Sequence, residues 1–157
     1  MITPEENIMK AAIEQAKQSH LRGEYAVGAA IVLNNEIIAE AGVTLLKEQD
    51  PTCHAEINAI RAACKVLGTR KLKECILYTT HEPCAMCATA SVWAHMKGIV
   101  FGLTVEDMND YRRKNNQRLV TEISVHTVAA QGDPKLEIVG PFMREECLSL
   151  LSLGIKE

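Results

Sequence analysis

Two short motifs constrain the fold of this chain more than any other feature, namely His54-Ala55-Glu56 and Pro83-Cys84-Ala85-Met86-Cys87. Apolar periodicity predicts a helix from about His54 to Leu67, and Pro83 suits the first turn of another helix that runs to about Met96. Because the two cysteines are three residues apart, their sulfurs lie on one side of that first turn. We therefore expect the amino ends of the two helices to converge.

The residue types in these motifs indicate a metal site. One imidazole, that of His54, and the two thiolates of Cys84 and Cys87 make three good zinc ligands. A catalytic zinc takes three protein ligands and keeps a fourth position for water, whereas a structural zinc usually takes four. Cys53 lies beside His54; we expect it to be a small buried group and keep it as an alternative ligand. The sequence predicts one zinc ion per chain.

Glu56 adds a proton carrier to this ligand set. Zinc lowers the pKa of a bound water to about 7, which supplies hydroxide near neutral pH. The carboxylate two residues from His54 can give the water proton to a ring nitrogen and then protonate a departing amino group. This combination is typical of zinc deaminases that act on nucleobases, in which the glutamate is not a ligand. A single Cys-x-x-Cys pair alone would also fit redox motifs and structural zinc sites.

The apolar segments around these helices predict a sheet. Val27 to Leu33 and Glu36 to Ala41 flank Asn34-Asn35, a pair that suits a tight turn, so a β-hairpin is expected. Cys75 to Thr80 and Gly98 to Leu103 are strands joined through a helix, which makes them parallel with a right-handed crossover. The fold class is therefore α/β, with three α/β/α layers.

The two ends of the chain supply further elements. Thr3-Pro4-Glu5-Glu6 predicts the start of a helix with Thr3 as its cap, and the helix extends to about His20. Thr104 to Asp133 is a mixed-charge stretch with a short helix that covers the sheet end or meets a partner. Lys135 to Val139 is the expected last strand, and helical spacing follows from Met143 onward.

Composition places limits on the class of protein. With 47% hydrophobic residues, the 157-residue chain fits one domain, residues 1–157, with a sizeable core. With a formal net charge of -3, the chain has no overall positive field that would attract a polyanion such as nucleic acid. No apolar run approaches the length that is needed to span a membrane. We expect a cytoplasmic protein without membrane association. The remaining cysteines are expected as small buried groups, and the lone histidines as surface or structural residues: Cys64, Cys75, Cys147, His20, His81, His95 and His126.

With these motifs the chain resembles the cytidine deaminase superfamily. Within it, the chain is similar to the branch that contains tRNA adenosine deaminases, guanine deaminases and yeast-type cytosine deaminases. The resemblance implies a mixed five-stranded sheet, zinc on the three ligands named above, Glu56 as proton shuttle and a homodimer. It also implies that the backbone at Ala55 helps to hold the substrate ring. The segments that carry it are Glu24 to Ala29, Asp50 to Glu56, Leu77 to Thr80, Glu82 to Cys87 and Val100 to Gly102.

One position departs from the family pattern. Relatives usually carry an asparagine in the loop after the second strand, where it hydrogen-bonds the base or sugar, and the matching position here is Val43. Valine offers no such hydrogen bond. The recognition group is therefore expected elsewhere, at Asp107 or Asp110, or the substrate differs from the usual ones.

The substrate remains open between alternatives. Cys87 to Ala94 resembles guanine deaminases, whereas Ile138 to Leu150 resembles the tail of tRNA adenosine deaminases. Our first hypothesis is deamination of a free nucleobase, nucleoside or related heterocycle, with guanine-like purines ahead of cytosine. The second is adenosine-to-inosine editing of tRNA. A third, of another class, is a catalytically silent zinc module, which the presence of Glu56 argues against.

Overall fold

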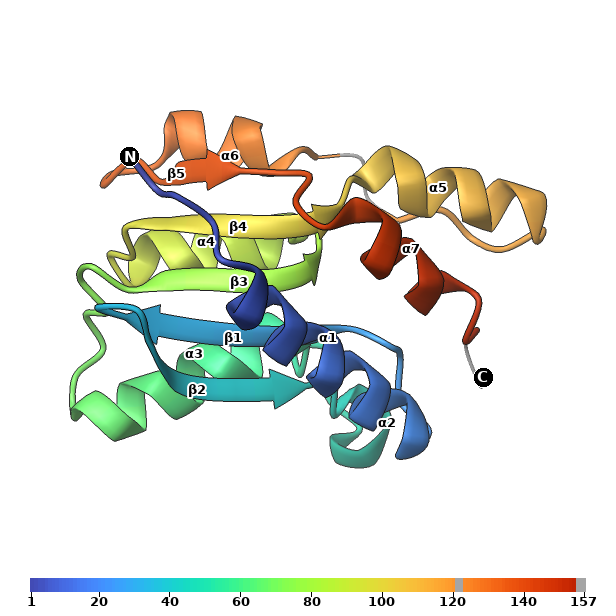
Figure 1. Cartoon of the computed structure of the whole chain (residues 1–157), viewed down its shortest axis with the longest axis horizontal. Helices are drawn as coiled ribbons and strands as arrows, with labels where there is room; N and C mark the ends of the chain where they lie inside the picture. The colour runs from blue at the N-terminus through green and yellow to red at the C-terminus, as the bar shows by residue number, and fades with distance from the viewer. Residues whose placement is uncertain (121–122, 155–157) are drawn as a thin grey trace.

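The computed structural model describes residues 1–120 and 123–154, and its strands form one five-stranded sheet in the order β2-β1-β3-β4-β5 (Figure 1). β1 pairs antiparallel with both β2 and β3, while β3–β4 and β4–β5 are parallel. The expected mixed sheet is therefore confirmed, including the parallel pair on either side of a helix. The strands are β1 (Gly28–Leu33), β2 (Glu36–Gly42), β3 (Ile76–His81), β4 (Gly98–Leu103) and β5 (Glu137–Val139).

Helices cover both faces of this sheet (Figure 1). Alternate strand residues divide the core into two clusters: Ile31 and Leu77 pack with α3, α4 and α6, whereas Val32 and Tyr78 pack with α1 and α7. Such alternation follows from the two-residue period of a strand. The α/β/α layering is confirmed. The helices are α1 (Glu6–Leu21), α2 (Leu45–Glu48), α3 (Ala55–Leu67), α4 (Ala85–Trp93), α5 (Val105–Lys114), α6 (Val125–Gln131) and α7 (Arg144–Leu151).

The predicted hairpin and the predicted helix end at Gly68 are both present. Asn34 and Asn35 have φ of 52° and 64°, the left-handed conformation that a two-residue turn between twisted strands requires. Gly68 ends α3 with φ of 64°, where a residue without a side chain is unstrained. Local turn chemistry thus fixes the segment that carries the first motif.

Two predicted helix boundaries are wrong. α1 begins at Glu6 with Glu5 as its cap, not Thr3, because the first residues run extended and bury Ile2 against the sheet. The Glu5 amide donates to the Tyr78 hydroxyl at 3.1 Å. α4 ends at Trp93 instead of Met96, because His95 takes a left-handed φ of 56° and turns the chain toward β4.

The stretch from Thr104 to Asp133 contains two helices where one was expected. α5 begins with a capping box in which Thr104 and Asp107 bond each other's backbone amides, and Ser124 caps α6. Residues 121–122 of this stretch lie outside the described part of the chain. The four-residue helix α2 was not predicted, since it is too short to show periodicity.

The six cysteines are free, and all but Cys64 and Cys84 are buried. The three outside the site and its adjoining loop, Cys64, Cys75 and Cys147, belong to the apolar clusters or pack against them. Within residues 1–120 and 123–154, helices long and apolar enough to cross a membrane are absent.

Candidate active site

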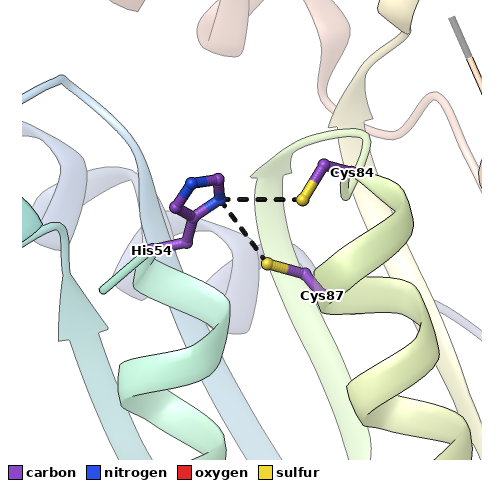
Figure 2. A group of neighbouring side chains, drawn as sticks. All are labelled: His54, Cys84 and Cys87. Carbon is purple, nitrogen blue, oxygen red and sulfur yellow. Dashed lines mark hydrogen bonds between the residues drawn. The ribbon is translucent and has the colours of Figure 1, made fainter. Parts of the chain in front are cut away.

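Two helix starts form the site. His54 is the N-cap of α3 and Cys84 is the N-cap of α4, and both have extended backbones. Neither side chain caps its own helix, so each is free to point toward the other (Figure 2). Cys84 therefore lies just before the first turn of α4 and not within it, while Cys87 lies inside the helix. The predicted convergence of the two amino ends is present.

The three predicted ligands lie within reach of one ion. His54 Nδ1 is 3.7 Å from Cys84 Sγ and 3.6 Å from Cys87 Sγ, and the three atoms lie within 4.8 Å of one another. Zinc binds sulfur at about 2.3 Å and imidazole nitrogen at about 2.0 Å, so a tetrahedral site requires a nitrogen–sulfur separation of roughly 3.6 Å. Both observed separations meet this requirement, so the donor set fits zinc.

The pKa values of the two thiols shift in opposite directions. The hydrogen bond from Cys87 and the contact with His54 lower the pKa of Cys84 to about 4. The same hydrogen bond, together with burial and the nearby Glu56, raises the pKa of Cys87. The contact with Cys84 also raises the pKa of His54, against the effect of burial. A divalent cation favours the thiolate form of both cysteines.

Glu56 lies beside the ligands in the first turn of α3. Its side chain is 4% exposed, and Thr79 Oγ1 donates to Oε1 at 3.1 Å while Cys87 Sγ donates to Oε2 at 3.6 Å. Burial raises the pKa of Glu56 above its ordinary value, so the carboxyl binds a proton more readily. A general acid and base that works near neutral pH needs such a shift.

A cavity of about 320 Å³ opens onto these residues. Its walls are mostly apolar side chains from the loops before β1 and after β2, from α5 and the segment after it, and from α7. Apolar walls with a few convergent polar groups are characteristic of small-molecule sites. The lining residues are Tyr25, Ala26, Val27, Val43, Leu45, His54, Ala55, Glu56, His81, Glu82, Cys84, Val105, Met108, Tyr111, Arg112, Gln117, Val120, Leu150, Leu151 and Gly154.

The structure brings only some of the predicted substrate residues to this cavity. Val43 and Ala55 line it, but Asp107 and Asp110 are not among its lining residues. Asp107 is part of the α5 capping box and pairs with Arg144 at 2.6 Å. Asp110 is exposed and pairs with Arg113 at 2.9 Å.

Cys53, the alternative ligand, lies in a different place. It lines a second, polar pocket together with Asn58, and its Sγ accepts a hydrogen bond from Arg61 Nη1 at 3.5 Å. The metal-ligating group found among the described residues consists of His54, Cys84 and Cys87 without Cys53.

Two buried glutamates hold the walls of the cavity. Glu82 accepts from the Val105 amide through Oε2 and from the Val125 amide through Oε1, each at 2.9 Å, so it joins the first residues of α5 and α6. Glu24 accepts from the amides of Leu46 and Lys47 at 3.0 and 2.8 Å and fixes α2. Carboxylates at helix starts are favoured by the backbone dipoles there.

Sequence reasoning did not assign several polar residues of the cavity, His81 and Gln117 among them. His81 and Gln117 both line it, although His81 was expected to be surface or structural. A signal for His81 exists in the sequence, since it shares the strand face of Thr79 at the end of β3, three residues before Cys84. Gln117 carries no such signal, because its place depends on how the chain turns after α5.

The chain belongs to the cytidine and deoxycytidylate deaminase family, whose zinc-binding region matches residues 2–103. It is 35% identical to the tRNA-specific adenosine deaminase of Bacillus subtilis over 99% of this chain and 91% of that protein. It is 51% identical to a guanine deaminase of the same organism, over 47% of each chain. The solved structure of guanine deaminase from Bacillus subtilis matches with a TM-score of 0.64 and 36% identity, covering 76% of this chain and 81% of that one.

This membership confirms three expectations. The resemblance to the superfamily holds, the chain is of the zinc-dependent hydrolytic deaminase class, and zinc is the cofactor of the family. His54, Cys84 and Cys87 form the candidate site for that ion.

Proposed function

We propose that this protein deaminates a free amino-substituted ring, a nucleobase, nucleoside or related heterocycle, with guanine-like purines ahead of cytosine. The single observation that carries the proposal is the cavity of about 320 Å³, which ends at the ligand triad and Glu56 and has α5 and α7 in its walls. This volume is at the small end of ligand pockets, which suits one heterocycle.

In the proposed reaction, water adds to the amine-bearing carbon and ammonia leaves. His54, Cys84 and Cys87 would hold one zinc ion, which supplies Lewis acidity and a nucleophile near neutral pH. Glu56 takes a proton from the attacking water and gives it to a ring nitrogen of the substrate. It then takes the proton of the added hydroxyl group and gives it to the departing amino group, which leaves as ammonia while the carbonyl forms. The bond from Thr79 Oγ1 fixes the carboxyl in place for both transfers. Val43 and the other apolar walls exclude bulk water from the ring.

We also propose that residues 1–157 act as one deaminase domain and that two copies form a homodimer. Trp93 at the end of α4 supports the dimer, because its side chain is 75% exposed. Large aromatic side chains are enriched in protein interfaces.

A second candidate is deamination of adenosine in a tRNA anticodon. The observation that favours it is the 35% identity to a tRNA-specific adenosine deaminase over nearly the whole of both chains. In this case the substrate base enters the same cavity out of a loop of RNA.

The experiment uses purified, zinc-loaded protein. Ammonia release is measured with guanine, cytosine, isocytosine, adenine and adenosine, and inosine formation is measured in an anticodon stem-loop. Glu56→Ala is the inactive control, and Glu36→Ala, on the exposed start of β2, is the matched control. Ammonia release from a free ring supports the first proposal, and inosine formation alone supports the second. Zinc-loaded protein that acts on neither would support the silent module.

A further inference from the structure

The cavity lacks a hydrogen-bonding side chain at Val43, so the groups that select the ring must come from elsewhere in its wall. Apart from the candidate ligands and Glu56, the polar lining residues are Tyr25, His81, Glu82, Tyr111, Arg112 and Gln117. Both oxygens of Glu82 already accept backbone amides. Among the others, His81 and Gln117 each have a polar side-chain atom without a hydrogen-bond partner in the described part of the chain.

His81 presents a hydrogen-bond donor. Its Nδ1 is 2.7 Å from Thr80 Oγ1, and that hydroxyl accepts the Gly28 amide at 3.2 Å. The hydroxyl proton is free to point at Nδ1, and we assign this tautomer to His81, which places the ring proton on Nε2. Burial, together with the nearby Arg112, lowers the pKa of His81 to about 4, so the ring is neutral near pH 7. Within the described residues, Nε2 has no hydrogen-bond partner, and it is available to a ligand.

Gln117 carries an acceptor in its side-chain amide. Its Oε1 is buried and finds no partner in the described part of the chain. The position of the residue is set by its own amide, which donates to the Arg112 carbonyl at 2.8 Å, while Arg112 Nη1 donates to the Arg118 carbonyl at 2.8 Å. A buried acceptor without a partner costs about 1–3 kcal/mol, and a ligand that donates to it recovers this energy.

We propose that His81 and Gln117 are the specificity-determining residues, and that they select rings with a lactam edge, a carbonyl oxygen beside a ring N–H. The carbonyl accepts from His81 Nε2, and the N–H donates to Gln117 Oε1. Guanine and isocytosine carry such an edge, with its N–H on the ring nitrogen next to the amine-bearing carbon, whereas adenine carries no carbonyl. The inference rests on the proposed function, because it names the substrate class of that same site.

Two matched pairs of rings test the inference. Guanine differs from 2-aminopurine, and isocytosine from 2-aminopyrimidine, only by the ring carbonyl and its N–H. Binding is measured on the zinc-loaded Glu56→Ala variant, so that no ring is consumed, with 2-aminopurine fluorescence as the probe and guanine as competitor. Calorimetry serves the pyrimidine pair. The lactam member of each pair is expected to bind at least about tenfold more tightly, which corresponds to about one buried hydrogen bond.

His81→Leu and Gln117→Leu, each combined with Glu56→Ala, are expected to reduce this preference by about tenfold. His81→Gln keeps an N–H donor and should restore part of it. Gln18→Leu, on the exposed face of α1, is the matched control and should leave the preference unchanged. Circular dichroism verifies that each variant is folded. If His81→Leu does not fold, the Gln117→Leu variant tests the lactam preference.

Equal binding of both members of each pair, or a preference that survives both leucine substitutions, would overturn the inference. The proposed function is judged separately by ammonia release from wild-type protein. If all four rings bind with the lactam preference but none releases ammonia, the recognition stands and the function fails. If both members of a pair are deaminated with equal kcat/KM and bind equally, the function stands and the recognition fails.

Discussion

At the scale of single residues, the proposed site separates the candidate metal ligands from the proposed proton carrier. The ligand atoms of His54, Cys84 and Cys87 face one another, while Glu56 lies beside them with its carboxyl bonded by Thr79. This separation has a direct experimental consequence, since side chains of the two kinds can be removed one at a time.

We predict that Cys84→Ala lowers both zinc content and stability, while Glu56→Ala keeps zinc and loses turnover. The first change removes a ligand whose metal bond also stabilises the folded state. The second removes a general acid and base, which costs about a hundredfold to ten-thousandfold in rate. Elemental analysis, thermal unfolding and ammonia release measure the three quantities. Equal zinc loss in both variants would contradict the separate roles.

The candidate metal ligands could be predicted to lie together from the sequence, whereas the place of Gln117 could not. Both motifs are short, and each lies where a helix begins, so local rules already place His54 and Cys84. Gln117 enters the cavity only because α5 ends and the chain turns back, which no local pattern encodes. Asp107 shows the opposite error, since its carboxylate pairs with Arg144 and with the start of its own helix instead of facing the substrate cavity.

At the scale of elements, the sheet and its main helices can be predicted from periodicity and turn residues. The positions of α5 and α6 near the site depend instead on long-range contacts. Glu82 is the clearest of these, because one side chain holds the starts of both α5 and α6. Two helices that are far apart in sequence from β3 are thereby fixed at its end.

We predict that Glu82→Ala destabilises the protein by about 2–4 kcal/mol, because two buried amides lose a strong acceptor. Glu82→Gln should cost less, since it keeps one carbonyl oxygen. Urea unfolding gives the free energies, and amide hydrogen exchange should show faster opening in residues 105–114 and 125–131 than elsewhere. Glu106→Ala, exposed in the first turn of α5, is the control. Uniform loss of protection across the whole chain would argue against a local role.

The pair of Asp107 and Arg144 joins α5 to α7 and gives a pH dependence. Burial alone would raise the pKa of Asp107, but the bonds from Arg144 and Thr104 outweigh it and lower the pKa below 3.8. A carboxyl with a lowered folded-state pKa stabilises above its unfolded pKa and loses this effect as pH falls through the folded value. Arg144→Ala should therefore lower the urea midpoint modestly at pH 7, and the difference from wild type should narrow below pH 3.8. A difference that stays constant down to pH 2 would exclude the ion pair as its cause.

At the scale of the whole molecule, the helices on the two faces of the sheet have different roles. α3 and α4 on one face supply the ligands, and α1 and α7 on the other complete the core (Figure 1). Exposed apolar side chains occur at the ends of helices on both faces, with Trp93 75% exposed on α4 and Leu21 74% exposed on α1. These two residues allow the proposed dimer to be assigned to one face.

If the ligand-bearing face forms the dimer, Trp93→Glu should convert dimer to monomer, because burying an unpaired carboxylate in an interface is costly. Leu21→Glu makes the same change on the opposite face and should leave the dimer intact. Light scattering after size exclusion measures the mass, and zinc content verifies that the site is unaltered. Since Cys84 is the N-cap of α4 and Trp93 is its last residue, a contact at Trp93 would hold the far end of the helix whose start carries the candidate ligands Cys84 and Cys87. If Leu21→Glu dissociates the dimer instead, the interface lies on the α1 face. A monomeric wild-type protein would contradict the proposed dimer.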